Sequence, residues 1–224
     1  MKKLPLLRFV STLLFLSNTA LAANSVDLRV TGTITPSACD ISLIGGDFDL
    51  GAISANTLAA TTTTTLPVSA GKTLNIVCSG ATQVAFKAID NRASSVPSGI
   101  AQIAVSAFGL GMDGVNKPIG YYQIQMQAAT VLVDGAAGKY KASDDSGASW
   151  FTFAATELSM VSFALSPRIY ALDLTTNGNA SQPTPITNAS VGLQVVATIQ
   201  PESTLDTNSQ IIIDGSATIE LVYL

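Results

Sequence analysis

The chain has 224 residues, of which 47% are hydrophobic and only 12% are charged, and it contains no histidine. The lack of histidine excludes Ser-His-Asp and Cys-His catalytic units, histidine-ligated metal sites and imidazole pH switches. Most hydrolase chemistry that depends on an imidazole is therefore excluded.

The first 22 residues have the layout of a secretory signal peptide. Lys2 and Lys3 give a positive start, residues 4–16 are mostly apolar, and small residues precede a cleavage site between Ala22 and Ala23. The apolar stretch is shorter than the ~18 residues expected of a membrane span. We expect an exported protein with no membrane span after cleavage.

The mature chain, residues 23–224, is acidic. Removing the signal peptide takes away three of the 11 basic residues and none of the 15 acidic ones, which leaves a net charge of −7. The remaining basic residues are scattered, so nucleic acid and anionic lipid are poor candidates as partners. A chain of ~200 residues can bury a core of its own, and we expect a single domain.

The elements predicted along this chain are strands with a period of two residues. The first is expected at 27–35, where Leu28 and Val30 alternate with polar side chains. Further strands are expected at 72–78, 83–89, 103–110, 122–127, 131–133, 150–153, 161–165, 191–199 and 217–224. Turn signals such as Asp-Gly separate them, and only 155–160 could make a helical turn. This pattern predicts an all-β protein, either an antiparallel β-sandwich or a barrel.

The two cysteines, Cys39 and Cys78, are predicted to form a disulfide, because both lie in an exported chain. In the entropy model a loop of this length contributes about 4 kcal/mol of stability. We interpret the bond as a structural link between strands of one core.

A turn of defined sequence follows the middle strands. Residues 143–150 fit S-x-D-x-G-x-S-W and resemble the Asp-box, a hairpin turn of many β proteins. Its residues are Ser143, Asp145, Gly147, Ser149 and Trp150. Asp145 can accept backbone N–H groups across the turn, Gly147 allows positive φ, and Trp150 can pack onto the core. The favoured interpretation is structural.

Two chemical alternatives involve this turn. Sialidase-like chemistry uses an arginine triad and needs no histidine, and the mature chain has Arg29, Arg92 and Arg168. A propeller needs more blades than this chain can supply, so we expect no enzyme. Calcium could bind at 144–146, but the series of acidic ligands typical of such loops is missing. No cofactor or metal is expected, and Asp47 and Asp49 are interpreted as part of a solvated turn.

The two ends of the mature chain resemble the subunits of chaperone-usher pili. Residues 31–39 fit the glycine-to-cysteine pattern of the first pilin strand, and Cys78 fits its partner. The last strand alternates apolar residues before a penultimate aromatic residue, at Ala217, Ile219, Leu221 and Tyr223. The resemblance implies an immunoglobulin-like, pilin-like sandwich that lacks a final strand. It also implies a periplasmic chaperone, an usher or a neighbouring fimbrial subunit as partner, which fills the groove beside this strand.

Two positions depart from the pilin pattern. Ile211 stands where those subunits carry a glycine, and only 23–25 precede the expected first strand at Val26. Such a chain could accept a strand without passing one on, which favours a tip or accessory position.

The middle of the chain is similar to a narrower, GltF-like family of exported enterobacterial proteins of unknown function. The similarity lies in 108–111, 119–122, 134–135 and 143–150, in that order.

Three hypotheses follow for the function. The leading one is a fimbrial-type structural or adhesion subunit in the periplasm or at the cell surface, acting by donor-strand exchange or by surface recognition, with a surface glycan as a further candidate ligand. The alternative is a self-complete soluble periplasmic binding domain of unknown ligand. The least favoured is a carbohydrate-acting enzyme built around the Asp-box hairpin.

Overall fold

The computed structural model describes residues 27–33, 38–100 and 103–224. The chain divides into two units, Met1–Thr35 and Pro36–Leu224. The described part of the first unit has no regular secondary structure. The second unit is all-β, and its only helical elements among the described residues are short 3-10 turns.

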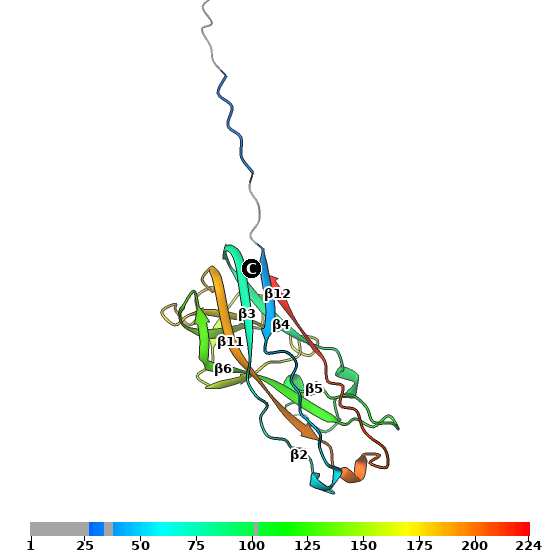
Figure 1. Ribbon diagram of the computed structural model, residues 1–224. Coiled ribbons are helices and arrows are strands. Elements are labelled where there is room, and N and C mark those ends of the chain that lie inside the picture. Colours follow the sequence, from blue (N-terminus) through cyan, green and yellow to red (C-terminus); the bar gives the residue numbers. More distant parts are fainter. Residues whose placement is uncertain (1–26, 34–37, 101–102) are drawn as a thin grey trace, which may run out of the picture. The chain divides into compact units, whose positions relative to one another are not determined.

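The strands of the second unit form two antiparallel layers (Figure 1). One layer has the order β1-β3-β11-β6 and the other β7-β10-β4-β12, and the β6–β7 hairpin joins them. The bounds are β1 Cys39–Ile44, β2 Thr64–Thr65, β3 Lys72–Thr82, β4 Val84–Asp90, β5 Phe108–Gly109, β6 Gly120–Val133, β7 Ala136–Ser143, β8 Phe151–Thr152, β9 Glu157–Ser159, β10 Ile169–Leu174, β11 Ile186–Ile199 and β12 Ala217–Tyr223. The 3-10 turns are η1 Ala55–Thr57, η2 Ala93–Ser95, η3 Ala104–Ser106 and η4 Glu202–Thr204. The predicted all-β antiparallel sandwich with one disulfide is confirmed.

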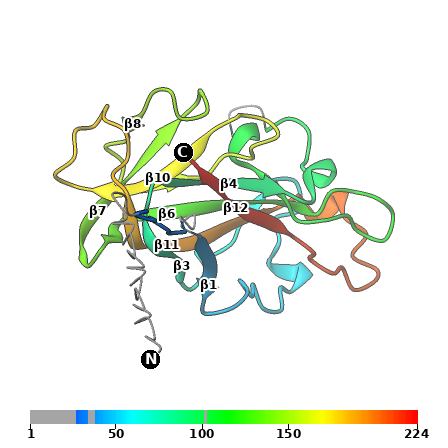
Figure 2. The same cartoon turned by 90° about the horizontal axis from the view of Figure 1, so that it is seen from above.

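The core lies between the layers, which Figure 2 shows from above. Ile76 on β3 and Met126 on β6 pack into the same apolar cluster as Phe86 on β4 and Tyr170 on β10. The strands that the sequence predicted best are those in which one face is buried, because alternation is then visible. In β6, apolar residues at every second position are buried while the glutamines between them are more exposed.

Several predicted strands differ from the structure. Residues 27–33 form no strand, and the side chains of Leu28 and Val30 are 89% and 88% exposed. Of residues 161–165, Ser162 forms only an isolated bridge to Ala88 and 163–165 form a turn, while 157–159, expected within a helical turn, form β9. Strand β10 was missed because its burial does not alternate: five of its six residues are buried.

The turn between β6 and β7 follows its sequence signal. Asp134 and Gly135 both have positive φ, as a tight two-residue hairpin requires. An oxygen of Asp134 also accepts hydrogen bonds from the backbone N–H groups of Thr187 and Asn188 at the start of β11.

Among the described residues no helix is long and apolar enough to cross a membrane.

Candidate functional site

A groove of about 750 Å³ runs from β1 to β12. Its floor is apolar: Ile124 of β6 and Leu193 and Val195 of β11 line it, and all three are buried members of the core. A groove with an apolar floor gives another apolar surface a place to pack against the core.

The groove lies between the two ends of the strand order. Strand β1 pairs with β3 and strand β12 pairs with β4, both antiparallel, and each is the last strand on its side of the path. Every neighbouring pair along the path is antiparallel, so β1 and β12 run in opposite directions. Each therefore presents a free edge of N–H and C=O groups among the described residues, and such an edge is a template for another strand.

The two edges meet at one end, near the C-terminus in Figure 1. Cys39 lies opposite Cys78 in the β1–β3 register, and the predicted disulfide between them is confirmed. The backbone N–H of Cys39 also donates a hydrogen bond of 2.9 Å to the hydroxyl of Tyr223 on β12. This end of the groove is therefore closed by the hydrogen bond from the β1 backbone to the Tyr223 side chain of β12, and the disulfide holds β1 to β3 beside it.

The residues predicted for the groove-edge strand all lie on β12. Ala217, Ile219 and Leu221 are partly buried and pack against the core. Ala217 and Ile219 also line the groove. Tyr223 is instead 54% exposed, and its hydroxyl contacts β1 as described above.

The opposite wall was not predicted. Residues 47–53 all line the groove, and they form no strand although 47–50 alternate in burial. Phe48 and Leu50 pack against the core, while Asp47 and Asp49 are exposed. The interpretation as a solvated turn was right for the two carboxylates and wrong for the segment as a whole. Its alternation of acidic and apolar residues was the signal that could have revealed it.

The Asp-box-like turn connects β7 to β8 and is closed by its own side chains. The Ser143 hydroxyl lies 2.7 Å from an oxygen of Asp145, which also accepts the N–H of Ser149 at 2.8 Å. Gly147 has a φ of +93°. The buried ring of Trp150 donates its N–H to the Gly147 carbonyl oxygen at 3.0 Å.

The acidic groups of this turn are already bound. The hydroxyl and N–H of Ser149 and the hydroxyl of Ser143 lower the pKa of Asp145 to about 2. Asp144 forms a bidentate ion pair with Arg168, at 2.6 and 2.8 Å, and this pairing lowers the pKa of Asp144. The Arg168 guanidinium also lies 5.5 Å from the ring of Phe151. These contacts account for the turn as a structural element.

Of the three arginines considered for a catalytic triad, two are in ion pairs with separate carboxylates. Arg92 binds Asp214, with a nitrogen to oxygen distance of 2.5 Å, and Arg168 binds Asp144. Arg29 lies in the first unit. The catalytic interpretation therefore gains no support from these contacts.

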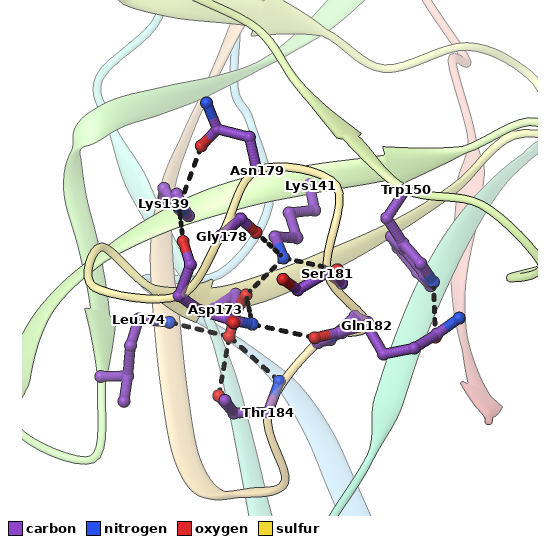
Figure 3. A network of polar contacts seen from close by, with 12 residues as sticks. Lys139, Lys141, Trp150, Asp173, Leu174, Gly178, Asn179, Ser181, Gln182 and Thr184 are labelled. Carbon is purple, nitrogen blue, oxygen red and sulfur yellow. Dashed lines mark hydrogen bonds and ion pairs between the residues drawn. The ribbon is translucent and has the colours of Figure 1, made fainter.

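A buried ion pair was missed by the sequence analysis. Lys141 of β7 and Asp173 of β10 lie diagonally across the strand pair, and their fully buried side chains form an ion pair of 2.9 Å (Figure 3). Lys141 also donates to the carbonyl oxygens of Gly178 and Ser181. Burial raises the pKa of Asp173, but hydrogen bonds from Thr184 and Lys141 outweigh it and lower that pKa overall. The pair attaches the loop after β10 to the sheet.

Two comparisons with known proteins bear on this geometry. Residues 28–106 match DUF1120, a family described as proteins of unknown function. The chain is also similar to the uncharacterized protein YhcF of Escherichia coli strain K12. The two are 28% identical over 94% of this chain and 95% of YhcF. The DUF1120 match includes the Asp47–Ile53 wall and begins at Leu28, ahead of β1.

The predicted signal peptide and its cleavage site at Ala22 and Ala23 lie outside the described residues. They remain predictions.

Proposed function

We propose that the protein is an exported, fimbrial-type structural subunit that accepts an extended strand of a neighbouring subunit in the groove between β1 and β12. The groove carries this proposal, because it combines a buried apolar floor with two free strand edges. A strand inserted there would gain backbone hydrogen bonds and place alternate side chains on the floor.

Two features of the sequence support export and a fimbrial role. The expected signal peptide and the disulfide both fit an oxidising compartment outside the cytoplasm. The resemblance of both chain ends to chaperone-usher pilins adds a periplasmic chaperone and an usher as expected partners. No catalytic role is included in the proposal.

The first strand was expected to begin at Val26, which left only residues 23–25 ahead of it as a donor segment. The first described strand begins instead at Cys39, and Leu28 and Val30 ahead of it are exposed. Leu28 and Val30 alternate with polar residues, so in an extended segment both apolar side chains lie on one face and can cover the groove floor. This segment of a second copy is therefore the donor that we propose.

A fluorescent peptide of residues 25–35 provides the test. Purified protein should bind it, and Ile219→Arg should abolish binding by placing a charge against the floor. Because Ile219 is partly buried, the exposed groove residue Ile212 offers a second variant, Ile212→Arg. Leu132→Arg is the matched control, since Leu132 is 49% exposed on β6 and does not line the groove.

The contradicting results are equally specific. The proposal would be overturned if the folded wild-type protein stays monomeric at all concentrations and does not bind the peptide. Its melting temperature would then be the same with and without the peptide. Equal binding by the groove variants and the control would overturn the assignment of the groove.

A further inference from the structure

The segment that precedes β12 has the pattern of a strand without a partner. Residues 210–216 lead into β12 with neither a turn nor a bend, and they form no strand with any described residue. Ile211 and Ile213 line the groove and pack against the core, whereas Ile212 between them is 64% exposed. Alternation of this kind is typical of a strand with one face on the core.

We infer that the inserted strand forms backbone hydrogen bonds with the groove-facing residues of the edge at 211–219, and that it thereby makes 210–216 an extension of β12. These residues alternate along the edge: Ile211, Ile213, Gly215, Ala217 and Ile219. The inference rests on the proposed function and specifies which backbone groups of the groove hold the strand.

The first argument is the direction of the backbone groups. The carbonyl oxygen of Ser216 accepts the N–H of Asn91, on the side of β4. The carbonyl oxygen of Asp214 likewise accepts a side-chain N–H of Arg92 at 3.0 Å, and its N–H donates to the Leu110 carbonyl oxygen at 2.9 Å. In an extended chain successive residues direct their N–H and C=O groups to opposite sides. The odd-numbered residues of this edge therefore direct theirs into the groove.

The second argument is that these groups are unpaired. The backbone N–H and C=O groups of Ile211, Ile213 and Gly215 form no hydrogen bond with any described residue. Both isoleucines are partly buried, and backbone polar groups that are removed from water are nearly always paired in folded proteins. A strand placed beside this edge would satisfy them.

The third argument is a polar side chain on the groove floor at the same level. Tyr122 lines the groove and is only 7% exposed, and its hydroxyl forms no hydrogen bond with any described residue. Burial raises the pKa of Tyr122, so the hydroxyl stays protonated and can donate. The ring lies against Gly215, where a Cβ would be 2.9 Å from a ring carbon. Unpaired groups on both wall and floor indicate an occupant with hydrogen-bonding groups of its own, which a polypeptide has and an apolar ligand lacks.

The opposite wall, at 47–53, offers a shorter edge. Gly45, Gly46 and Gly51 have positive φ, which interrupts an extended strand on either side of 47–50. The edge at 211–219 contains no residue with positive φ and continues directly into β12. Continuous pairing is therefore available on the β12 side, where the inserted strand would add to the layer β7-β10-β4-β12.

Hydrogen exchange resolved at single amides by NMR tests the inference, with the peptide of residues 25–35 as the probe. When the peptide binds, exchange at Ile211 and Ile213 should slow by about tenfold or more, because their N–H groups enter hydrogen bonds. The Ile212 amide faces away from the groove and should change far less. A slip of the peptide by two residues leaves this pattern intact, since every register presents carbonyl oxygens to the same N–H groups.

Proline variants provide a second measurement. Ile213→Pro removes an N–H that faces the groove, and Ile212→Pro removes one that faces away. Each is compared with the alanine variant at the same position, which loses the side chain but keeps the N–H. Ile213→Pro should bind the peptide about tenfold more weakly than Ile213→Ala, and Ile212→Pro should bind as well as Ile212→Ala. Melting curves verify that the four variants are folded.

The outcomes separate this inference from the proposed function. Equal slowing at the three isoleucine amides, or no slowing at Ile211 and Ile213 in a protein that binds the peptide, would overturn the pairing edge while leaving binding in the groove intact. Equal affinities of folded Ile213→Pro and Ile213→Ala would also overturn it. Failure of the peptide to bind would overturn the proposed function and, with it, this inference.

Discussion

The turn at 143–150 and the groove between β1 and β12 differ in whether their polar groups are bonded within the chain. In the turn, Asp145 is bonded to Ser143 and Ser149, and Asp144 is paired with Arg168. In the groove, β1 and β12 have free edges among the described residues. A recognisable sequence motif can therefore have a purely structural role. Binding of a partner is expected instead where strand pairing is incomplete.

The loop after β10 belongs with the turn in this comparison, because its polar groups are also bonded internally. Lys141 and Asp173 anchor it, and Trp150 of the turn donates its ring N–H to Gln182 of the same loop at 2.8 Å. Changes in this region should affect stability, and changes in the groove should affect binding.

The largest loss of stability is expected from Lys141→Met. It leaves Asp173 buried without its cation, which costs about 3–5 kcal/mol of unfolding free energy. Urea unfolding measures the loss. Lys139→Met is the matched control, because Lys139 bonds carbonyl groups of the same loop but forms no ion pair with any residue that the structure describes. Equal losses in the two variants would contradict the assigned role of the buried pair.

Removing the disulfide should have the next largest effect. The double variant Cys39→Ser and Cys78→Ser opens a loop with a sequence separation of 39 residues and should lower the unfolding free energy by about 4 kcal/mol. It also frees the closed end of the groove, so peptide binding should weaken. Loss of stability with unchanged binding would show that the disulfide does not hold β1 in place for the partner.

A smaller loss is expected from Asp145→Ala, which removes the acceptor for Ser143 and Ser149. The melting temperature should fall by about a few degrees, with peptide binding unchanged. Asp145→Asn retains one side-chain oxygen and should lose less. Weaker peptide binding by a folded Asp145→Ala protein would remove the distinction between turn and groove.

The dependence of stability on pH should be small near neutrality. The chain has no histidine, so no side chain with an ordinary pKa of ~6.5 titrates there. The folded-state pKa values of Asp144, Asp145 and Asp173 are lowered, so their stabilisation is complete above the unfolded value of ~3.9 and is lost as the pH falls through the folded values.

Asp90 acts in the opposite direction. Burial raises its pKa, so its contribution is lost as the pH rises through the folded value and is recovered on acidification. The expected melting temperature is therefore nearly constant from pH 8 to pH 6 and falls below about pH 4. A melting temperature that changes steeply near pH 6.5 would contradict this account.

The sequence predicted the parts of the fold that depend on local pattern. The alternation in β6 and the cysteines of β1 and β3 were enough to indicate a disulfide-linked antiparallel sandwich. Strand β10 was hidden because burial on both faces removes the alternation. The Lys141–Asp173 pair joins residues 32 positions apart, and a local pattern does not reveal such a contact.

The candidate site in the groove was also predicted only in part. Ala217 and Ile219 were predicted at the groove edge because β12 alternates, whereas the second wall was missed because Asp47 and Asp49 suggested a turn. Residues 27–33 were predicted as a strand because they alternate, yet alternation cannot specify which strand provides the partner. Only the arrangement of the described strands reveals the free edges.

The most direct test of the central claim is hydrogen exchange of the purified protein with and without the peptide of residues 25–35. We expect slower exchange at residues 47–53 and 217–223, the two walls, and unchanged exchange at 143–150. Protection of the turn without protection of either wall would contradict the claim that the groove receives the strand.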